Sequence, residues 1–169
     1  MKIIHIPQCA SLMDEMKKMS ECPVALYTDF QTAGRGQHDH VWESQKGKNL
    51  LCGIIFDSTP LKTPENVSRH TVESVMKTLD FYLENSGRKT RFKYPNDIYI
   101  DDRKICGMLI ENYFQSGQLF LSHIGLGINV NEDFISSNTL SAVSLRDVLG
   151  CELKIEEVFA KFIDNFELR

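Results

Sequence analysis

The sequence lacks the features that mark several common classes of protein. No run approaches the ~20 apolar residues that a membrane helix needs, and no signal-peptide pattern opens the chain. The five cysteines are odd in number, widely spaced and without a Cys-x-x-Cys pair, so neither a disulfide framework nor a thiolate zinc site is indicated. The P-loop pattern and the dinucleotide fingerprint Gly-x-Gly-x-x-Gly are both absent. These absences favour a cytoplasmic protein that does not use the two commonest nucleotide-binding signatures.

An excess of basic charge is also missing. The chain has 19 Lys and Arg residues against 23 Asp and Glu, a net charge of −4. Because non-specific nucleic-acid binding normally requires a basic face, DNA is not an expected partner, and neither is a membrane. With 169 residues, 42% of them apolar, and no repeats or low-complexity linkers, the chain is expected to form one domain over residues 1–169.

Apolar runs separated by turn residues predict alternating helices and strands. Thr63 followed by Pro64 is typical of a helix start, and Gly87 is the expected stop of that helix. The expected strands are 3–6, 24–28, 49–56, 91–93, 98–100, 105–113 and 119–130, and the other helices are 11–19, 145–149 and 155–166. Cys52 and Cys106 lie in apolar runs and are interpreted as core residues. This order predicts an α+β fold with a mixed, largely antiparallel sheet flanked by helices.

The most informative stretch is Lys93-Tyr94-Pro95-Asn96-Asp97. Pro95 fixes its own φ and biases Tyr94 toward an extended backbone, so the following polar side chains should be held on stiff backbone. Residues 101–104 are interpreted as the connection between two strands, and Asp101-Asp102 as a turn rather than an acid/base pair. Lys104 is therefore expected close to the start of a strand, beside a rigid sheet.

A second stretch runs from Asp29 to Gln37 and is followed by Trp42, directly after the strand expected at 24–28. Glycines on both sides of Arg35 permit close approach of the backbone to a ligand, and its guanidinium is a planar donor for carboxylate or phosphate. The pattern predicts a mobile anion-binding loop. Alternatively, Gly34 and Gly36 only form a turn, Arg35 is a surface ion-pair partner, and Trp42 packs the core or the loop.

Four blocks in this order resemble the biotin protein ligase family, over about residues 11–149. The blocks are Gly34-Arg35-Gly36 with Trp42, Lys93 to Asp97, the set Arg103, Lys104, Gly107, Leu109 and Glu111, and Gly125-Leu126-Gly127-Ile128-Asn129. A weaker similarity lies at 11–15. The resemblance implies a fold like that of class II aminoacyl-tRNA synthetases and biotin ligases.

The resemblance implies a reaction in two steps. Biotin reacts with ATP and Mg²⁺ to give biotinyl-5′-AMP, and a lysine of a biotin carboxyl carrier protein domain then displaces AMP. Lys104 corresponds to the catalytic lysine, whose ammonium offsets repulsion between the carboxylate and the α-phosphate. Arg35 corresponds to a second catalytic residue, on a loop that closes over the adenylate and keeps water out.

The same matching implies the binding residues. The biotin side comprises Ser11, Gln31, Gly34, Arg35, Gly36, Gln37, Lys104, Gly107, Gly125 and Gly127. The nucleotide side comprises Trp42, Asn96, Asp97, Lys104 and Asn129. No residue is assigned as a Mg²⁺ ligand, and His38 and His40 lack the further ligands that a zinc site needs. Gly125 and Gly127 could instead mark a strand bulge.

The sequence also departs from the family pattern. Gln37 stands where many relatives have a second arginine, which predicts weaker retention of the adenylate, and Leu12 replaces the usual threonine. Neither an N-terminal winged-helix domain nor a complete C-terminal SH3-like barrel is expected within these 169 residues. Relatives often pair through sheet edges, so a homodimer is a candidate state. Two other functions stay open: lipoate or octanoate transfer on the same fold, and a non-catalytic module that binds biotin or a partner.

Overall fold

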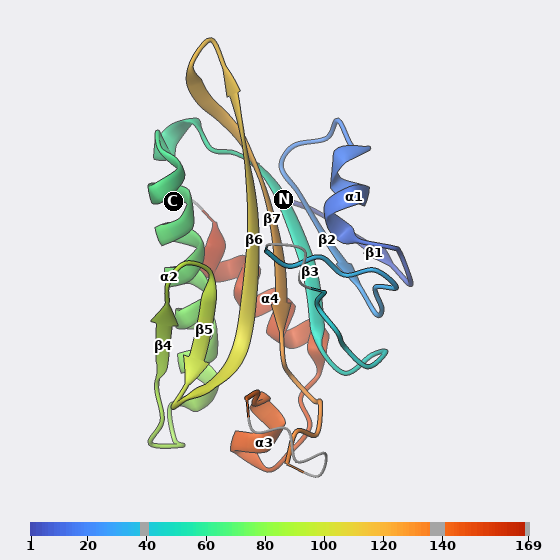
Figure 1. Ribbon diagram of the computed structural model, residues 1–169, viewed down its shortest axis with the longest axis vertical. Helices are drawn as coiled ribbons and strands as arrows, with labels where there is room; N and C mark the ends of the chain where they lie inside the picture. The colour runs from blue at the N-terminus through green and yellow to red at the C-terminus, as the bar shows by residue number, and fades with distance from the viewer. Residues whose placement is uncertain (38–40, 136–140, 168–169) are drawn as a thin grey trace.

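A seven-stranded sheet forms the framework of the computed structural model, which describes residues 1–37, 41–135 and 141–167 (Figure 1). The strand order is β1-β2-β3-β7-β6-β5-β4, and every described neighbouring pair except β1 with β2 is antiparallel. The strands are β1 (Lys2–Ile6), β2 (Val24–Thr28), β3 (Leu50–Asp57), β4 (Thr90–Lys93), β5 (Asp97–Ile100), β6 (Arg103–Gln115) and β7 (Gln118–Ile128). The helices are α1 (Leu12–Lys17), α2 (Pro64–Leu83), α3 (Leu145–Leu149) and α4 (Ile155–Phe166), with a 3₁₀ turn at Thr59–Leu61. The predicted α+β fold is confirmed.

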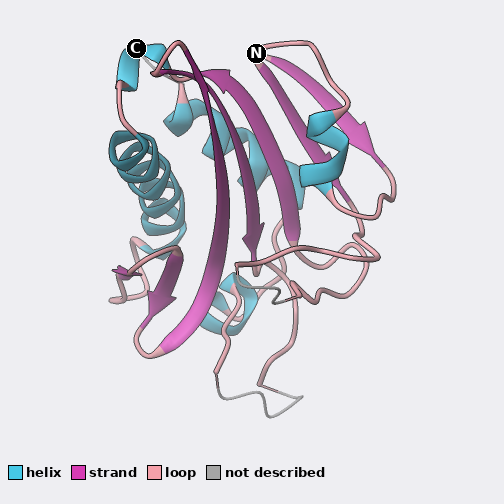
Figure 2. Cartoon of the chain, turned by 45° about the horizontal axis from the view of Figure 1, so that its top comes forward, coloured by secondary structure: helices cyan, strands magenta, loops and turns pink. Residues whose placement is uncertain are grey.

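The two faces of the sheet carry different cores, because side chains alternate between the faces along each strand. On one face, α2 and α4 pack over the central strands, and their contacts include Leu79, Phe162 and Phe166. On the other face, the short helix α1 packs over β3, β7 and β2. Figure 2 shows helices lying on both sides of the curved sheet. Since α1 covers only part of its face, the rest of that face is free to form a site.

Local signals explain the long helix α2. The Thr63 side chain accepts a hydrogen bond from the Asn66 amide, and Pro64 occupies the first turn, as expected for a helix start. The helix ends at Leu83, four residues before the expected stop at Gly87. Its buried side is made of Val67, Thr71, Val72, Ser74, Val75, Thr78, Leu79 and Leu83. No described helix combines the length and apolar character needed to cross a bilayer.

The predicted start of strand β6 was wrong. Lys104 was placed in the connection between two strands, whereas β6 begins at Arg103 and Lys104 is its second residue. The turn is shorter than expected because Asp101 takes a φ of +53° and reverses the chain within two residues. Asp101-Asp102 therefore forms the turn, as predicted, and Lys104 is fixed within the sheet. His38 and His40 lie outside the described residues.

Truncation of Phe162 is expected to destabilise the fold strongly. Its side chain is fully buried between α4, α2 and the sheet. Phe162→Ala should lower the free energy of unfolding by about 3–5 kcal/mol, measured by urea denaturation. Phe114→Ala, at an exposed position near the end of β6, serves as the matched control and should change it by much less. An equal loss of unfolding free energy in Phe162→Ala and Phe114→Ala would contradict the assignment of Phe162 to the main core.

Candidate active site

Glycines hollow the sheet on the face where α1 lies. Gly107 on β6 pairs with Gly127 on β7, and Gly125 lies two residues earlier on the same side of β7. A Cβ at Gly125 would come within 2.8 Å of the Met13 sulfur, and one at Gly127 within 2.3 Å of Trp42 Cε2. We call these three residues the glycine floor, because their lack of side chains lets Met13 and Trp42 lie directly on the sheet. Pairing is regular here, so the bulge alternative is wrong.

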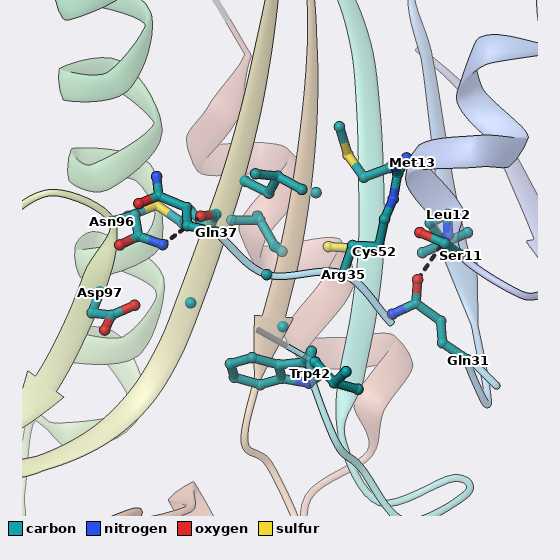
Figure 3. A pocket seen from close by; sticks show the side chains of 18 of the residues that line it. Ser11, Leu12, Met13, Gln31, Arg35, Gln37, Trp42, Cys52, Asn96 and Asp97 are labelled. Atoms are coloured by element: carbon teal, nitrogen blue, oxygen red, sulfur yellow. Dashed lines mark hydrogen bonds between the residues drawn. The ribbon is translucent and has the colours of Figure 1, made fainter. Parts of the chain in front are cut away.

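A cavity of about 270 Å³ lies over the glycine floor (Figure 3). The structure brings most of the predicted site residues to its wall: Ser11, Gln31, Arg35, Gly36, Gln37, Trp42, Asn96, Asp97, Lys104, Gly107, Gly125 and Gly127. Gly34 and Asn129 do not line it. The sequence analysis missed the apolar wall residues Met13, Val41 and Leu109. Such residues look like ordinary core positions in a sequence, and Met13 and Val41 come from a helix and a loop that meet the sheet only in the folded protein.

One side of the cavity presents a buried hydroxyl group without a partner. Ser11 directly precedes α1 with an extended backbone, yet its side chain makes no capping bond to the helix. Its Oγ is buried and has no hydrogen-bond partner among the described residues. Beside it, the side-chain oxygen of Gln31 accepts a 2.7 Å hydrogen bond from the Leu12 main-chain amide, which fixes the Gln31 carboxamide (Figure 3). An unmade buried hydrogen bond costs roughly 1–3 kcal/mol, so this side suits a polar group of a ligand.

The other side carries the ion pair between Lys104 and Asp97. The Lys104 ammonium lies 2.7 Å from the Asp97 carboxylate and 5.4 Å from the centre of the Trp42 ring. Asp97 is the first residue of β5, and the preceding Asn96 makes two 2.9 Å hydrogen bonds with Met108. The Asn96 side-chain nitrogen donates to the Met108 carbonyl, and the Met108 amide donates to the Asn96 main-chain carbonyl. Both charged groups are part-exposed at the cavity wall, so the ammonium is oriented by protein and open to an anionic ligand.

The loop that contains Arg35 folds back over the cavity. The Trp42 amide donates to the Gly34 carbonyl at 3.0 Å, and Arg35 forms an antiparallel bridge with Val41. A Cβ at Gly34 would lie 2.7 Å from the Trp42 carbonyl oxygen, so this glycine permits the return of the loop. Arg35 lines the cavity and also forms a 2.6 Å ion pair with Asp14 of α1. The surface ion pair considered above is thus present, within the cavity wall.

A further ion pair fixes α1 against β6 beside the cavity. The Lys17 ammonium lies 2.9 Å from the Glu111 carboxylate, to which the Tyr113 hydroxyl also donates at 3.1 Å. Burial acts to raise the pKa of Glu111, but the hydrogen bonds from Lys17 and Tyr113 outweigh it and leave that pKa below its ordinary value. The Glu111 carboxylate therefore stays ionised at neutral pH and keeps the wall helix in place.

Two cysteine thiols near the site belong to the core. Burial raises the pKa of the Cys52 and Cys106 thiols far above neutrality, so both are inert core residues as predicted. Within the described part of the chain, no group of three or more His, Cys, Asp or Glu residues is arranged to hold a metal ion. Asn129 lies behind Lys104, and its carboxamide donates to the carbonyls of Lys104 and Val143.

Comparisons with known proteins agree with this geometry. The Biotin/lipoate A/B protein ligase family matches residues 15–129. The bifunctional ligase/repressor BirA of Bacillus subtilis is 32% identical over 148 residues, which cover 85% of this chain and 45% of that protein. Biotin–protein ligase 2 of Arabidopsis thaliana is 31% identical over 172 residues, covering 98% of this chain and 51% of that protein. The chain therefore spans about half the length of these curated relatives.

Solved structures show the same fold. Biotin protein ligase from Aquifex aeolicus in complex with biotin and ATP superposes with a TM-score of 0.78 at 26% identity, covering 98% of this chain and 68% of that chain. The enzyme from Leishmania major in complex with biotin gives a TM-score of 0.76 at 20% identity, covering 98% of this chain and 72% of that chain. With the family match over residues 15–129, these likenesses show that the chain belongs to the biotin/lipoate A/B protein ligase family.

Proposed function

We propose that this chain activates biotin with ATP as biotinyl-5′-AMP and transfers biotin to a lysine of a biotin carboxyl carrier protein domain. One observation carries the proposal: the Lys104 ammonium, held by Asp97, shares a glycine-floored cavity with the buried Ser11 hydroxyl, to which the described residues offer no hydrogen-bond partner. Figure 3 shows Ser11 and Gln31 on one side of the cavity and Asn96 and Asp97 on the other. The Aquifex aeolicus relative, solved with biotin and ATP, supports the choice of substrates.

The two sides of the cavity fit the two ends of biotin. The ureido ring has donors and an acceptor, which match the free Ser11 hydroxyl and the fixed Gln31 carboxamide. The apolar valeryl chain then lies between these two sides, beside Leu109 and Met13. This orientation delivers the carboxylate toward the Lys104 ammonium, where the two opposite charges attract.

In the first step, a biotin carboxylate oxygen attacks the α-phosphorus of ATP, the bond to the leaving pyrophosphate breaks, and a mixed anhydride forms. Lys104 reduces repulsion between the two anions and stabilises charge that grows on the phosphate oxygens. Asp97 keeps the ammonium in place before the substrates arrive. Mg²⁺ enters as part of the ATP complex, in which phosphates supply several of its ligands.

In the second step, the acceptor lysine amine attacks the carbonyl carbon of the adenylate, an amide forms, and AMP leaves. Water would hydrolyse the same anhydride, so the cavity must exclude it. The Arg35 loop and Trp42 form the cover that does this. Gln37 lines this cover and brings no positive charge, so we propose that the adenylate is held mainly by Arg35 and Lys104.

Arg35→Ala is expected to speed dissociation of biotinyl-5′-AMP by roughly tenfold or more, because an ion-pairing donor worth about 1.5–3 kcal/mol is removed from the cover. Stopped-flow dissociation measures this directly. Arg88→Ala is a matched control, since Arg88 is 41% exposed against 40% for Arg35 and is also ion-paired, with Asp101, away from the cavity. Unchanged dissociation from Arg35→Ala would reject the role of the loop.

The whole reaction is tested by mass spectrometry of a carrier protein domain incubated with the chain, ATP, Mg²⁺ and either biotin or lipoate. A mass increase equal to one biotin, lost when the acceptor lysine is replaced, is the expected result. Modification by lipoate instead would favour lipoate transfer. Tight biotin binding without modification of the acceptor and without AMP release would favour a non-catalytic module.

Cysteine state, net charge and one sheet edge bear on where the protein acts and what it pairs with. We propose that it acts in the cytoplasm, in keeping with five free cysteines, and without DNA or membrane partners, in keeping with the net charge of −4. Strand β5 pairs with β6 from Arg103 to Gly107, and Asn96 binds Met108, so β6 from Leu109 onward has no neighbouring strand on this edge of the described sheet. This edge is the place we propose for pairing if the protein is a homodimer.

A further inference from the structure

Asn129 stands where β7 leaves the sheet next to the start of β6. The strand ends at Ile128, whose partner on β6 is Cys106, so β7 no longer borders β6 at Lys104. Asn129 is 4% exposed and does not line the cavity. Its main-chain amide donates to the Ile105 carbonyl at 2.8 Å. The side chain is thus packed behind the reactive lysine and away from the ligand space.

A separate segment takes over as the neighbour of Lys104 at this point. The Lys104 amide donates to the Ser141 carbonyl at 3.0 Å, and the Val143 amide donates to the Lys104 carbonyl at 3.0 Å. These bonds make a parallel bridge between Lys104 and Ala142. On its other side Lys104 pairs with Tyr99 of β5. The backbone of Lys104 is therefore held between β5 and the segment 141–143.

The Asn129 carboxamide joins the two sides of this bridge. Its nitrogen donates to the Lys104 carbonyl at 3.3 Å and to the Val143 carbonyl at 3.2 Å. Both amide hydrogens are thus used by backbone carbonyls, and an amide nitrogen has only two. The Asn129 side chain could contact a ligand only through its carboxamide oxygen. This arrangement differs from the nucleotide contact that the sequence analysis assigned to Asn129.

We propose that Asn129 is a positioning residue, which fixes the Lys104 backbone against segment 141–143 and so sets where the ammonium meets the reacting carboxylate and phosphate. The inference rests on the proposed function of Lys104. A misplacement of about 1 Å in a catalytic group can cost up to about 100-fold in rate, so a backbone lock directly under the lysine has kinetic consequences.

The test compares Asn129→Asp with Asn131→Asp. Aspartate keeps the size of asparagine but replaces the donating nitrogen by an oxygen that repels carbonyls. Asn131 is the matched control: it is 6% exposed, lies two residues on, and binds the Leu153 backbone through bonds of 2.7 and 2.8 Å, without contact to Lys104. Asn129→Asp removes both bonds that the carboxamide nitrogen donates, whereas Asn131→Asp removes the bond donated to the Leu153 carbonyl and keeps the bond accepted from the Leu153 amide. Asn129→Asp should therefore cost the more stability of the two.

Two readouts are measured on both variants. Backbone amide exchange, followed by NMR, should accelerate at Lys104 and Val143 in Asn129→Asp only. The kcat of biotin-dependent pyrophosphate release should fall about 10- to 100-fold in Asn129→Asp, with little change in KM for ATP, while Asn131→Asp keeps its kcat. Stability is checked by urea denaturation, so that a loss of folded protein is not counted as a loss of rate.

Each outcome is decisive. A raised KM for ATP at normal kcat would mean that Asn129 binds the nucleotide, and would overturn the proposal. Equal losses of kcat in both variants would reduce Asn129 to a structural residue, which also overturns it. If the wild-type chain releases no pyrophosphate with biotin, the proposed function fails, yet the exchange measurement still decides whether Asn129 fixes the Lys104 backbone.

Discussion

Replacing Lys104 with alanine is expected to slow biotinyl-adenylate formation about 100- to 1,000-fold while the fold stays intact. The Lys104 ammonium is the positive group that the structure places beside Asp97 at the cavity wall. Alanine carries no charge, so the variant has no group at this position to stabilise the phosphate oxygens. Its side chain is 31% exposed, so truncation opens no cavity in the core. Single-turnover formation of labelled adenylate measures the effect, and circular dichroism reports the fold.

Lys48→Ala is the matched control for this change. Lys48 is also ion-paired, to Glu152 at 2.9 Å, and is 38% exposed, but it does not line the cavity. Its replacement should leave adenylate formation within about twofold of wild type, as expected for an exposed ion pair worth less than about 1 kcal/mol. Normal adenylate synthesis by Lys104→Ala would remove the catalytic assignment of Lys104, whatever the control shows.

Adding one methyl group to the glycine floor is expected to weaken ligand binding. In Gly127→Ala the new Cβ would lie 2.3 Å from Trp42 Cε2 and 2.7 Å from Nε1, so the indole must leave the sheet. Overpacking of this kind costs about 1–3 kcal/mol, and we expect ligand affinity to fall roughly tenfold or more. Trp42 is the single tryptophan of the chain, so its fluorescence reports the displacement without interference.

Two further variants show whether Trp42 is the cause. Gly53→Ala would also meet a neighbour, but at 2.9 Å this is the flexible end of Met16, which can rotate away, so a small effect is expected. In a Trp42→Ala background, Gly127→Ala should have little additional effect on ligand affinity because its clash partner is gone. An unshifted emission spectrum and unchanged affinity in Gly127→Ala alone would contradict the close packing of the indole on β7.

Local patterns predicted those parts of the fold that local interactions determine. Strand β2 and helix α3 have the predicted bounds, since an apolar run fixes the first and a cap at Ser144 with a left-handed Gly150 fixes the second. Helix α1 is shorter than predicted, at Leu12–Lys17, because Ser11 precedes it with an extended backbone and Lys18 is its C-terminal capping residue. Helix ends are commonly displaced by one or two residues from those that a sequence pattern indicates.

The site could be predicted in its residues but not in its geometry. The resemblance to the biotin protein ligase family implied that Lys104, Arg35 and several glycines share one site, and the cavity is lined by Lys104, Arg35 and all of these glycines except Gly34. The sequence could not show that the glycine floor is covered by Met13 and Trp42, because those contacts join distant parts of the chain. The position of Asn129 depends in the same way on segment 141–143, which comes beside Lys104 only in the folded protein.

The central claim is that the glycine-floored cavity joins biotin to the α-phosphate of ATP beside Lys104. Pyrophosphate release by the 169-residue chain, without any acceptor protein and with biotin or lipoate in parallel, tests it most directly. The account predicts release that requires ATP and biotin, fails with lipoate, and yields one biotinyl-5′-AMP per active site. Pyrophosphate release with lipoate but not with biotin would contradict the claim. So would the absence of pyrophosphate release despite measurable binding of biotin and ATP.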